Sequence, residues 1–424
     1  MKILHLSKMD YGGGAADGFV RIHQALLSQG HDSVAYVIKH RRTDVAHLID
    51  ARHLLGFWQK MKWGLGRIFA KSKRWRMKPV GVYDFDTEAN FPAQPLIEDA
   101  KKRHNHWDLI LIHWAGGFVR PETIQEIAQA LGARVALWQI DMAHVTGGCH
   151  YNYYDCMKYV TGCGACPLIG SKDPHDVSFQ QAQVRRKVWS DLAVKVFAPT
   201  PWSAGQAKES WILKDRPLGI FPIPLNLEIL RPASNRESVR KLFDIPQGVR
   251  VMLVRGINPA LSPHKGFGLL LEALRLVDAE GIPLYVLVVG EKGLLGEQWK
   301  HVTFKEVGMK RGDSEISTVY QAADYFVNPS INDNGPMMVG EALVSGVPVI
   351  AFPVGLPAVP WNEGRVGMVV KPIGDVVALA HAIKTFAEMS EEDLSAMKLA
   401  AAEAARNLYS AKHYSDALEQ ALRS

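Results

Sequence analysis

Two acidic side chains in the second half of the sequence have the spacing needed to recognise a ligand rich in hydroxyl groups. Asp333 stands in a loop after a strand expected at Asp324–Asn328, and Glu341 lies inside a helix expected at Pro336–Val344. Carboxylates accept several hydrogen bonds at once, as sugar and ribose recognition requires. The free amides at the start of this helix suit a phosphate group. The pattern predicts a site for a phosphorylated, hydroxyl-bearing molecule, and the alternative is a purely structural role for Glu341.

Two cations that come earlier in the sequence could neutralise the charge of such a phosphate. Arg255 follows a strand expected at Val249–Val254, and Lys265 directly precedes a helix expected at Gly266–Asp278. Positive charge placed there would stabilise a phosphate leaving group as its negative charge develops. The alternative is that both are ordinary surface cations.

The chain has four cysteines, and all of them lie in the stretch 149–166. Disulfides are disfavoured in a reducing cytoplasm, whereas four thiolates suit tetrahedral coordination of zinc. Because four sulfur ligands leave no open coordination position, the zinc would be structural and would brace a loop beside Asp141. Unliganded thiols and an iron–sulfur cluster are the alternatives. The predicted zinc ligands are Cys149, Cys156, Cys163 and Cys166.

Strands and helices alternate in both halves of the sequence, which is typical of βαβ units with parallel sheets. Two such runs, separated by the proline-containing stretch Arg216–Pro232, predict an α/β protein with two Rossmann-like domains facing each other across a cleft. We place the first domain, with the four cysteines, at 1–215 and the second at 216–395. Helices at 396–424 either stay with the second domain or cross back to the first. The other expected strands are Lys2–Ser7, Ser33–Lys39, Leu109–His113, Arg134–Gln139, Val194–Ala198, Leu284–Gly290, Val302–Glu306 and Val347–Phe352, and the other expected helices are Ala15–Gln29, Glu122–Leu131 and Gln180–Leu192.

The length and composition are those of a globular protein with more than one core. At 424 residues, with 47% hydrophobic and 22% charged side chains, the chain suits two domains and lacks the composition of a disordered protein. The N-terminus shows no signal-peptide pattern, and no uncharged apolar run reaches about 18 residues. The expected location is therefore the cytoplasm.

A basic stretch with interleaved aromatic residues occurs in the first half of the sequence. From Ala51 to Tyr83 there are many cations and no acidic residue. Basic residues mixed with tryptophans suit an anionic membrane surface or a nucleic-acid backbone, and the alternative is a solvated helix packed on its own domain. We expect Phe57–Lys78 to dock on the anionic inner face of the cell membrane, with no nucleic-acid partner. Gly64 and Gly66 weaken a continuous helix, so one helix and two short segments are both open.

The residues from Asp333 to Phe352 resemble the acidic motif of family 4 retaining glycosyltransferases, which have the GT-B fold. The pair Asp333–Asn334 is similar to that of a subgroup that makes bacterial surface polysaccharides and carries a four-cysteine insertion. The resemblance implies that Glu341 holds the nucleotide ribose and that Asp333 meets the transferred sugar. It also implies that Arg255 and Lys265 face the donor diphosphate. The remaining donor-binding residues that it implies are Gly13 and Gly14 in the loop Asp10–Ala16, together with Asn334, Gly335, Pro336 and Met337.

The activity implied by this resemblance is transfer of a hexosyl residue, with retention at the anomeric carbon. The donor would be a nucleotide-diphosphate-sugar, and the acceptor a glycan or a lipid-linked glycan in surface polysaccharide synthesis, with no catalytic metal. Relatives in the subgroup commonly carry His-Asp before a Thr-Gly-Gly-Cys stretch, whereas this chain has Ile140–Asp141. The alternative is therefore a nucleotide-sugar-binding or scaffold protein with little or no turnover. The expected catalytic residues are Asp141, Asp333, Lys265 and Arg255.

Two other interpretations of nearby residues are less favoured. A dinucleotide-binding oxidoreductase is excluded because Gly12, Gly13 and Gly14 lack the G-x-G-x-x-G spacing. His113 and His144 lie near the ends of expected strands, but a single histidine is more often structural than catalytic. We therefore expect both histidines to be structural.

Overall fold

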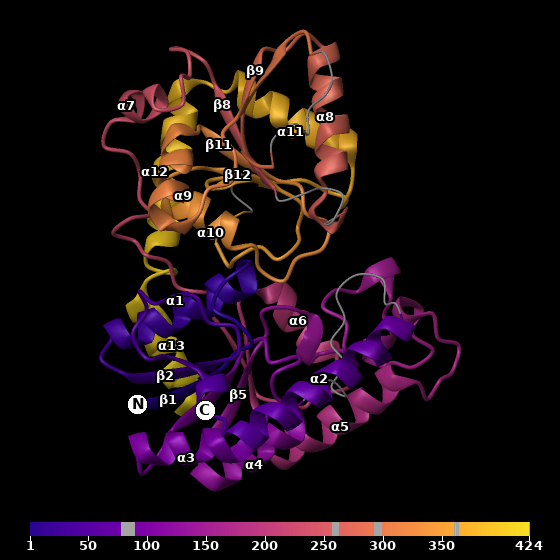
Figure 1. Ribbon diagram of the computed structural model, residues 1–424. Coiled ribbons are helices and arrows are strands. Elements are labelled where there is room, and N and C mark those ends of the chain that lie inside the picture. Colours follow the sequence, from indigo (N-terminus) through magenta and orange to yellow (C-terminus); the bar gives the residue numbers. More distant parts are fainter. Residues whose placement is uncertain (78–89, 257–262, 292–298, 360, 362–363, 424) are drawn as a thin grey trace. The chain divides into compact units, whose positions relative to one another are not determined.

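The structure is a computed structural model that describes residues 1–424 apart from 78–89, 257–262, 292–298, 360, 362–363 and 424. The side chains of 69–77 and 154 are likewise outside the description. The chain divides into two compact units (Figure 1). The first contains Met1–Ile223 with Tyr414–Ser424, and the second contains Pro224–His413. The division thus falls after residue 223, and the C-terminal segment belongs to the first unit.

In the described part of the first unit, seven parallel strands form a central sheet in the order β3-β2-β1-β4-β5-β6-β7. The chain winds outward in two directions, starting from β1 and β4 at the middle. In sheets of this kind, ligands bind at the carboxyl ends of the strands, where the winding direction reverses. The strands are β1 (Lys2–Leu6), β2 (Asp32–Val37), β3 (Leu48–Asp50), β4 (Leu109–Ile112), β5 (Arg134–Trp138), β6 (Lys195–Ala198) and β7 (Leu218–Ile220).

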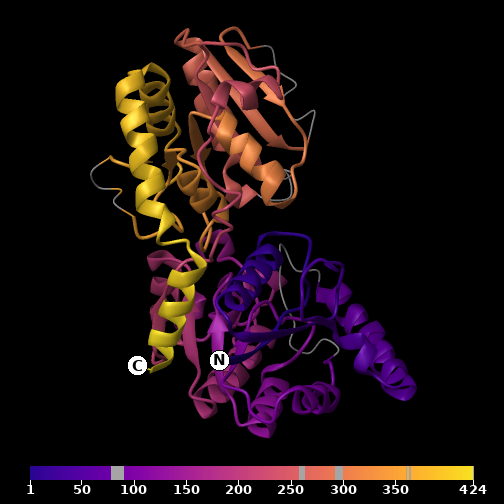
Figure 2. The same cartoon turned by 90° about the vertical axis from the view of Figure 1, so that its left-hand side faces the viewer.

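The helices of the first unit cover this sheet because one face of each carries apolar side chains. The C-terminal helix shows this clearly: Tyr414 is buried, and its ring lies 5.5 Å from that of Trp138 and 5.2 Å from that of Phe221. Figure 2 shows this helix, in yellow, beside the strands of the first unit. The helices are α1 (Gly14–Ser28), α2 (Phe57–Met77), α3 (Ala93–Arg103), α4 (Pro121–Leu131), α5 (Val177–Asp191), α6 (Pro201–Glu209) and α13 (Ala411–Arg423).

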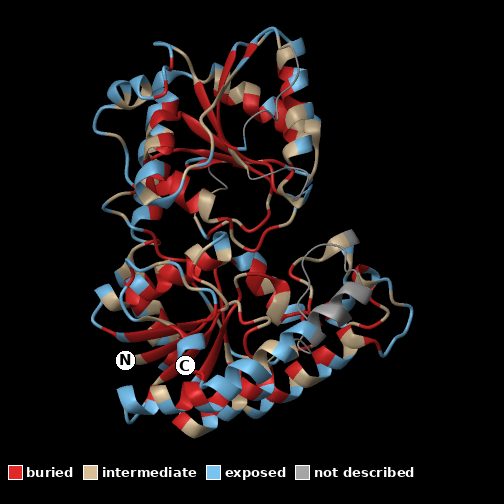
Figure 3. Cartoon of the chain, in the orientation of Figure 1, coloured by how far each residue is buried: buried red, intermediate tan, exposed pale blue. Residues whose placement is uncertain are grey.

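The described part of the second unit contains a parallel sheet of six strands in the order β10-β9-β8-β11-β12-β13. Its winding direction reverses between β8 and β11. Figure 3 shows the central strands of both sheets in red, because helices pack on both faces of each sheet. The elements are β8 (Val251–Gly256), β9 (Leu284–Gly290), β10 (Val302–Glu306), β11 (Tyr325–Asn328), β12 (Val349–Ala351), β13 (Gly367–Val369), α7 (Arg236–Lys241), α8 (Phe267–Ala279), α9 (Gly312–Ala322), α10 (Met337–Val344), α11 (Val376–Glu388) and α12 (Glu391–Arg406).

The α/β class with two parallel sheets is confirmed, and the strands predicted at β9 and β10 have the expected bounds. The basic stretch forms one helix, α2, which continues through Gly64 and Gly66. Of the stretch expected to dock on a membrane, Lys78 lies outside the described residues. Within the described chain, no helix has both the length and the apolar character needed to cross a bilayer.

Candidate functional site

The second unit brings the four predicted charged residues to the carboxyl ends of its central strands. Arg255 lies near the end of β8, and Lys265 ends the short turn that leads into α8. Asp333 lies in the loop after β11, and Glu341 lies on α10, which follows that loop. The winding direction of the sheet reverses between β8 and β11, so the residues gather where such folds bind ligands.

Backbone hydrogen bonds link the turn that carries Lys265 to the loop that carries Asp333. The amides of Ile331 and Asn332 donate to the carbonyl oxygen of His264 at 2.9 and 3.3 Å. Gly266 has φ +69°, and a Cβ atom there would lie 1.8 Å from the carbonyl oxygen of Pro329. Only glycine allows the turn after Lys265 to approach the end of β11 this closely.

Arg255 and Glu341 form a buried ion pair that a tyrosine supports. The Arg255 guanidinium contacts the Glu341 carboxylate and donates to the Tyr320 hydroxyl at 2.6 Å. The Tyr320 hydroxyl lies 3.2 Å from the same carboxylate and 2.9 Å from the carbonyl oxygen of Met338. Burial raises the pKa of Tyr320, so the phenol is neutral and can donate. Tyr320 therefore fixes the direction in which both charged groups point.

Lys265 and Asp333 form a second ion pair beside the start of α10. The Lys265 ammonium contacts the Asp333 carboxylate, whose other oxygen accepts from the amide of Gly335 at 3.3 Å. Pro336 caps α10 without a side-chain hydrogen bond to the first amides of the helix. A Cβ atom at Gly355 would lie 2.7 Å from the carbonyl oxygen of Asp333, so this glycine keeps the loop in place.

The arrangement can recognise both charge and hydroxyl groups. Two cations are paired with two carboxylates, and the four formal charges cancel. A diphosphate would share Arg255 and Lys265 with their present partners, because a guanidinium and an ammonium each have several donor hydrogens. The carboxylates have further lone pairs for hydroxyl groups. Such a site fits a ligand that carries phosphate and sugar together.

The glycine loop of the first unit opens directly into α1. Gly12 and Gly13 have φ values of +93° and +144°, which side-chain-bearing residues rarely adopt. The helix begins at Gly14 without a side-chain cap on its first amides. Asp10, at the start of the loop, ties it to the segment after β2, because its buried carboxylate accepts hydrogen bonds from the amides of Arg41 and Arg42 at 3.0 and 3.1 Å. Glycine-rich turns at the start of a helix suit the binding of an anion by backbone amides.

Asp141 follows β5 and is held by two contacts from its own loop. Its carboxylate accepts from the amide of Ala143 at 2.8 Å and lies 2.5 Å from Nδ1 of His150. Arg185 on α5 supports the same loop by donating to the carbonyl oxygens of Ala143 and Thr146, both at 2.7 Å. These hydrogen bonds within the protein therefore fix the position of the Asp141 carboxylate.

A cavity of about 30 Å³ lies beside Asp141 and is also lined by His113, Trp114, His144 and Arg185. A single water needs about 10–15 Å³ of such space, so the cavity is large enough for one or two small polar groups and too small for a sugar ring. The side chains around it offer hydrogen-bond donors and an aromatic ring.

The histidines near this cavity belong to a buried network. Nδ1 of His5 lies 2.9 Å from Nε2 of His113, and the hydroxyl of Ser33 lies 2.8 and 2.7 Å from His5 and His23. His144 contacts the carbonyl oxygen of His113 at 3.0 Å. Burial lowers the pKa of His113 to about 3 and that of His23 to about 4, so both are neutral at physiological pH. The network joins β1, β2, β4 and α1.

The four cysteines are free thiols, and all of them line one cavity in the loop between β5 and α5. Among the residues that the structure describes, no group of three or more His, Cys, Asp or Glu side chains is arranged to hold a metal ion. The four cysteines predicted to bind zinc therefore lie close together, and the binding of zinc itself stays a prediction.

Three residues of these sites were not predicted from the sequence. Tyr320, His150 and Arg185 are buried or nearly so and contact Glu341, Asp141 or the loop beside it. For Tyr320 and Arg185 no local pattern gives a signal, because helices α9 and α5 carry buried residues for packing in any case. His150 follows Cys149 directly and could have been considered with the cysteine cluster.

Part of the second unit matches a known protein family. Residues 251–404 match the family model described as glycosyl transferases group 1. The chain is 29% identical over 160 residues to a D-inositol 3-phosphate glycosyltransferase of Corynebacterium glutamicum (strain R), covering 34% of this chain and 37% of that protein. It is 27% identical over 227 residues to the protein of that name from Streptomyces scabiei (strain 87.22), covering half of each. The chain thus spans half or less of the length of these relatives.

Solved structures resemble the whole chain in fold. Sucrose-phosphate synthase from Thermosynechococcus elongatus superposes with a TM-score of 0.64 at 17% identity, covering 100% of this chain and 98% of that one. Anabaena Alr3699/HepE in complex with UDP and glucose superposes with a TM-score of 0.61 at 16% identity, covering 100% and 99%. At these identities the likeness shows the fold alone. Residues 251–404 therefore match the group 1 glycosyl transferase family, within a chain that has the fold of GT-B glycosyltransferases.

Proposed function

We propose that the protein is a retaining glycosyltransferase that moves a hexosyl group from a nucleotide-diphosphate-sugar to a glycan or lipid-linked acceptor in surface polysaccharide synthesis. The observation that carries the proposal is the set of two ion pairs, Arg255 with Glu341 and Lys265 with Asp333, at the carboxyl ends of β8 and β11. The family match covers these four residues. Anabaena Alr3699/HepE, which shares the fold, is described in complex with UDP and glucose.

The chemistry requires charge stabilisation more than strong acids or bases. The bond between the anomeric carbon and the diphosphate oxygen breaks, and negative charge builds on that oxygen. Arg255 and Lys265 would neutralise this charge, which is worth most in the transition state. The acceptor hydroxyl forms the new bond on the same face, and its proton passes to the departing phosphate oxygen. Glu341 would hold the ribose hydroxyls, and Asp333 the hydroxyls of the transferred sugar.

The exposed face of α2 supports the proposal that the protein meets its acceptor at an anionic membrane surface. The side chains of Phe57, Trp58 and Ile68 are 69%, 77% and 65% exposed, and Met61 and Leu65 are also exposed. At about 100° per residue, these five positions fall within an arc of about 100° on one side of the helix. Figure 3 shows the described part of this helix mostly in pale blue, the colour of exposed residues. An apolar face of this kind fits the boundary between lipid headgroups and acyl chains.

The charges on α2 flank that apolar face. Lys60 and Arg67 lie along one edge of the arc and Lys62 along the other, and all three are exposed. Trp63, on the opposite side, packs against Phe91 with ring centroids 5.5 Å apart and anchors α2 to the core. Cations near an anionic surface contribute about 1 kcal/mol each. The helix is thus held by its own unit on one side and offers a cationic, apolar face on the other.

One observation favours a second candidate function, which is donor binding without turnover. Ile140 precedes Asp141, and the Asp141 carboxylate is already engaged by Ala143 and His150. Nothing in this pair supplies the histidine that the resembled subgroup places next to the sugar. A protein of this kind would bind a nucleotide-sugar and release no product.

A donor screen tests the proposal and separates the two candidates. The protein would be heated with uridine, guanosine and adenosine diphosphates and with their sugar conjugates. A ligand at 100 times its dissociation constant stabilises the folded state by about 2.7 kcal/mol, so one class should raise the melting temperature. Slow release of free sugar from the stabilising donor supports transfer, and stabilisation without release supports the second candidate. No stabilisation by any nucleotide would contradict both.

A further inference from the structure

The loop between β5 and α5 is long for a connection inside a compact unit. It runs from Gln139 to Asp176, and its described backbone forms short 3-10 turns but no α-helix or strand. Structureless connections of this length are uncommon and usually have a functional or structural reason. A long loop without an α-helix or strand can gain further order from a crosslink or a bound ion.

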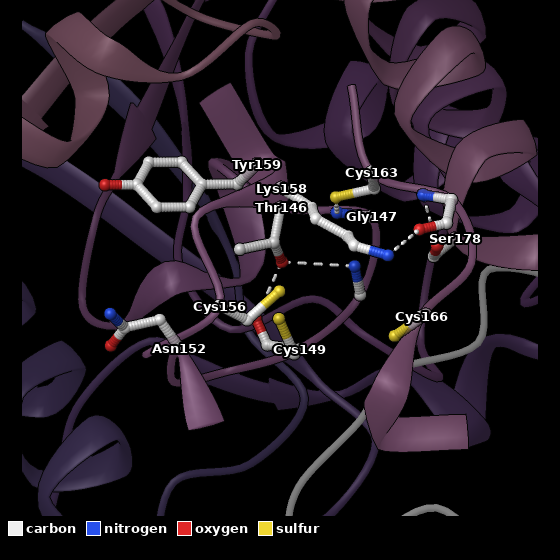
Figure 4. Close-up of a pocket in the computed structure, with 12 residues that line it drawn as sticks. Thr146, Gly147, Cys149, Asn152, Cys156, Lys158, Tyr159, Cys163, Cys166 and Ser178 are labelled. Atoms are coloured by element: carbon white, nitrogen blue, oxygen red, sulfur yellow. Dashed lines mark hydrogen bonds between the residues drawn. The ribbon is translucent and has the colours of Figure 1, made fainter. Parts of the chain in front are cut away.

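The four cysteines of the chain surround one small cavity in this loop. Figure 4 shows Cys149, Cys156, Cys163 and Cys166 among the residues that line this cavity, with Gly147 beside Cys163. The cavity has a volume of about 20 Å³. This is room for one water-sized sphere, since a single water needs about 10–15 Å³. A space of this size suits a single ion.

The backbone around the cavity is built to hold the thiols in place. Cys163 and Ala165 have φ values of +66° and +41°, which cost energy in residues with a side chain. A Cβ atom at Gly147 would lie 2.1 Å from the carbonyl oxygen of Ser178, and one at Gly164 would lie 2.1 Å from that of Pro174. Strained and closely packed turns of this kind persist only where the surrounding structure requires them, and they are frequent at ligand clamps.

One hydrogen bond already points at a sulfur atom. The amide of Gly147 donates to Sγ of Cys163 at 3.2 Å. Amide hydrogens of this kind stabilise a thiolate, which is the form that binds metals. Lys158, which also lines the cavity, directs its ammonium to the carbonyl oxygens of Gly164 and Ala165 at 3.2 and 2.6 Å and so closes the turn between Cys163 and Cys166.

We propose that Cys149, Cys156, Cys163 and Cys166 together bind one structural zinc ion in this cavity. In the described structure no three of these or other ligand-type side chains are yet arranged around an ion. A change of one χ1 rotamer moves a thiol sulfur by roughly 3 Å, and the proposal requires rotations of this size to bring the sulfurs around one ion. Four thiolates in tetrahedral geometry fill the coordination sphere of zinc and leave no position for a substrate.

The zinc ion would fix the loop that holds Asp141. Cys149 accepts a hydrogen bond at its carbonyl oxygen from the Thr146 hydroxyl at 2.7 Å, and His150 follows Cys149 in the chain. His150 contacts the Asp141 carboxylate at 2.5 Å, and its carbonyl oxygen accepts from the amide of Met142 at 3.1 Å. One ligand of the ion is therefore adjacent to the residue that orients Asp141. The proposal stands whether or not the protein has transferase activity.

Metal analysis of the whole protein tests this proposal directly. Protein purified under reducing conditions without chelators should contain about one zinc per chain and no iron. Replacing the zinc by cobalt should give the intense visible absorption of a tetrahedral ion and a thiolate charge-transfer band. Alkylation of the thiols after unfolding should release one equivalent of zinc to a chromogenic chelator. Protein that contains no metal, or that has disulfides at these positions, would overturn the proposal.

Variants separate ligation from simple disturbance of the loop. Cys163→Ser and Cys156→Ser should each reduce the zinc content at least several-fold. Asn152→Ala changes another residue that lines the cavity and should keep the full zinc content. If both serine variants are folded by circular dichroism and retain one zinc per chain, the cysteines are not its ligands. If they unfold, the metal content and cobalt spectrum of the unchanged protein still decide the question.

Discussion

Replacement of Glu341 by alanine should weaken nucleotide binding and also reduce the stability of the second unit. The Glu341 and Arg255 side chains are 4% and 14% exposed, so the change leaves a largely buried guanidinium without its anionic partner. Removing one partner of a buried pair costs about 3–5 kcal/mol. Since Arg255 keeps its hydrogen bond to Tyr320, we expect a loss near the lower end, about 3 kcal/mol. For a unit of this size that lowers the melting temperature by about 6–12 °C.

The loss of affinity follows from the hydrogen bonds that the carboxylate would make to the ribose. Bonds to a charged group contribute about 1.5–3 kcal/mol. This corresponds to an increase of about 10- to 150-fold in the dissociation constant for the nucleoside diphosphate. Glu341→Gln keeps the volume and one acceptor oxygen, so its affinity should fall by less, about fivefold.

The assay is isothermal titration of the nucleoside diphosphate well below the melting temperature of the variant. Glu272→Ala, an exposed position on α8, is the matched control and should leave both quantities unchanged. Unchanged affinity in Glu341→Ala together with a lowered melting temperature would make Glu341 a structural residue. That result would refute the donor-site assignment.

Four further predictions follow from the same contacts. Lys265→Ala should reduce turnover by at least tenfold with a smaller effect on donor affinity, because charge stabilisation matters most in the transition state, as steady-state kinetics would show. Tyr320→Phe should weaken nucleotide binding about fivefold in a titration, because the hydroxyl that orients the Arg–Glu pair is lost. The unfolded chain protonates His23 near pH 6.5 and the folded chain only near pH 4, so this group lowers the stability as the pH drops through this window, by up to about 1.4 kcal/mol per pH unit. Urea unfolding should therefore show a shallower pH dependence in His23→Gln than in the unchanged protein. Changing Lys60 and Lys62 together to Gln should reduce co-sedimentation with anionic liposomes several-fold at low salt, because both cations flank the apolar face of α2.

Each of these predictions has a matched control in the chain. Lys300→Ala removes an exposed cation of the second unit and should leave turnover unchanged. In the described structure the buried Tyr325 hydroxyl has no hydrogen-bond partner, so Tyr325→Phe should not affect binding. His53 is exposed, so the substitution His53→Gln should leave the pH dependence of the stability unchanged. Lys101 and Lys102 on α3 are exposed cations, and their replacement should leave liposome binding intact. If a control has the same effect as its test variant, the corresponding prediction fails.

The sequence predicted the long strands of this fold well and the short edge strands poorly. The strands at β9 and β10 were predicted with their observed bounds. The continuous apolar run of β9 marks a strand that is buried on both faces. The strands β3, β7 and β13 have three residues each and were not predicted. A run of three residues has no detectable periodicity, and its strand character comes from pairing with a neighbour that is distant in the sequence.

Of the site, the sequence predicted residues that share a local motif and missed those contributed from elsewhere. Asp333 and Glu341 lie in one continuous stretch, and the structure places Asp333 after β11 beside Lys265 and Glu341 on α10 beside Arg255. Tyr320 reaches the pair from α9, and nothing in its own surroundings distinguishes it from a core tyrosine. The sequence also left undecided whether the stretch of α2 forms one helix or two short segments, because Gly64 and Gly66 have low helix propensity. The structure has one helix, and packing of Trp63 on Phe91 outweighs this low propensity.

The most direct test of the proposed function is to follow the anomeric carbon by NMR while the protein acts on the donor that stabilises it. We expect release of the nucleoside diphosphate and a product, either free sugar or a glycoside, that first appears with the anomeric configuration of the donor. Lys265→Ala should slow this release, and Lys300→Ala should not. A product of inverted configuration would contradict a retaining reaction. Tight donor binding with no release, under conditions that keep the protein folded, would contradict glycosyl transfer itself.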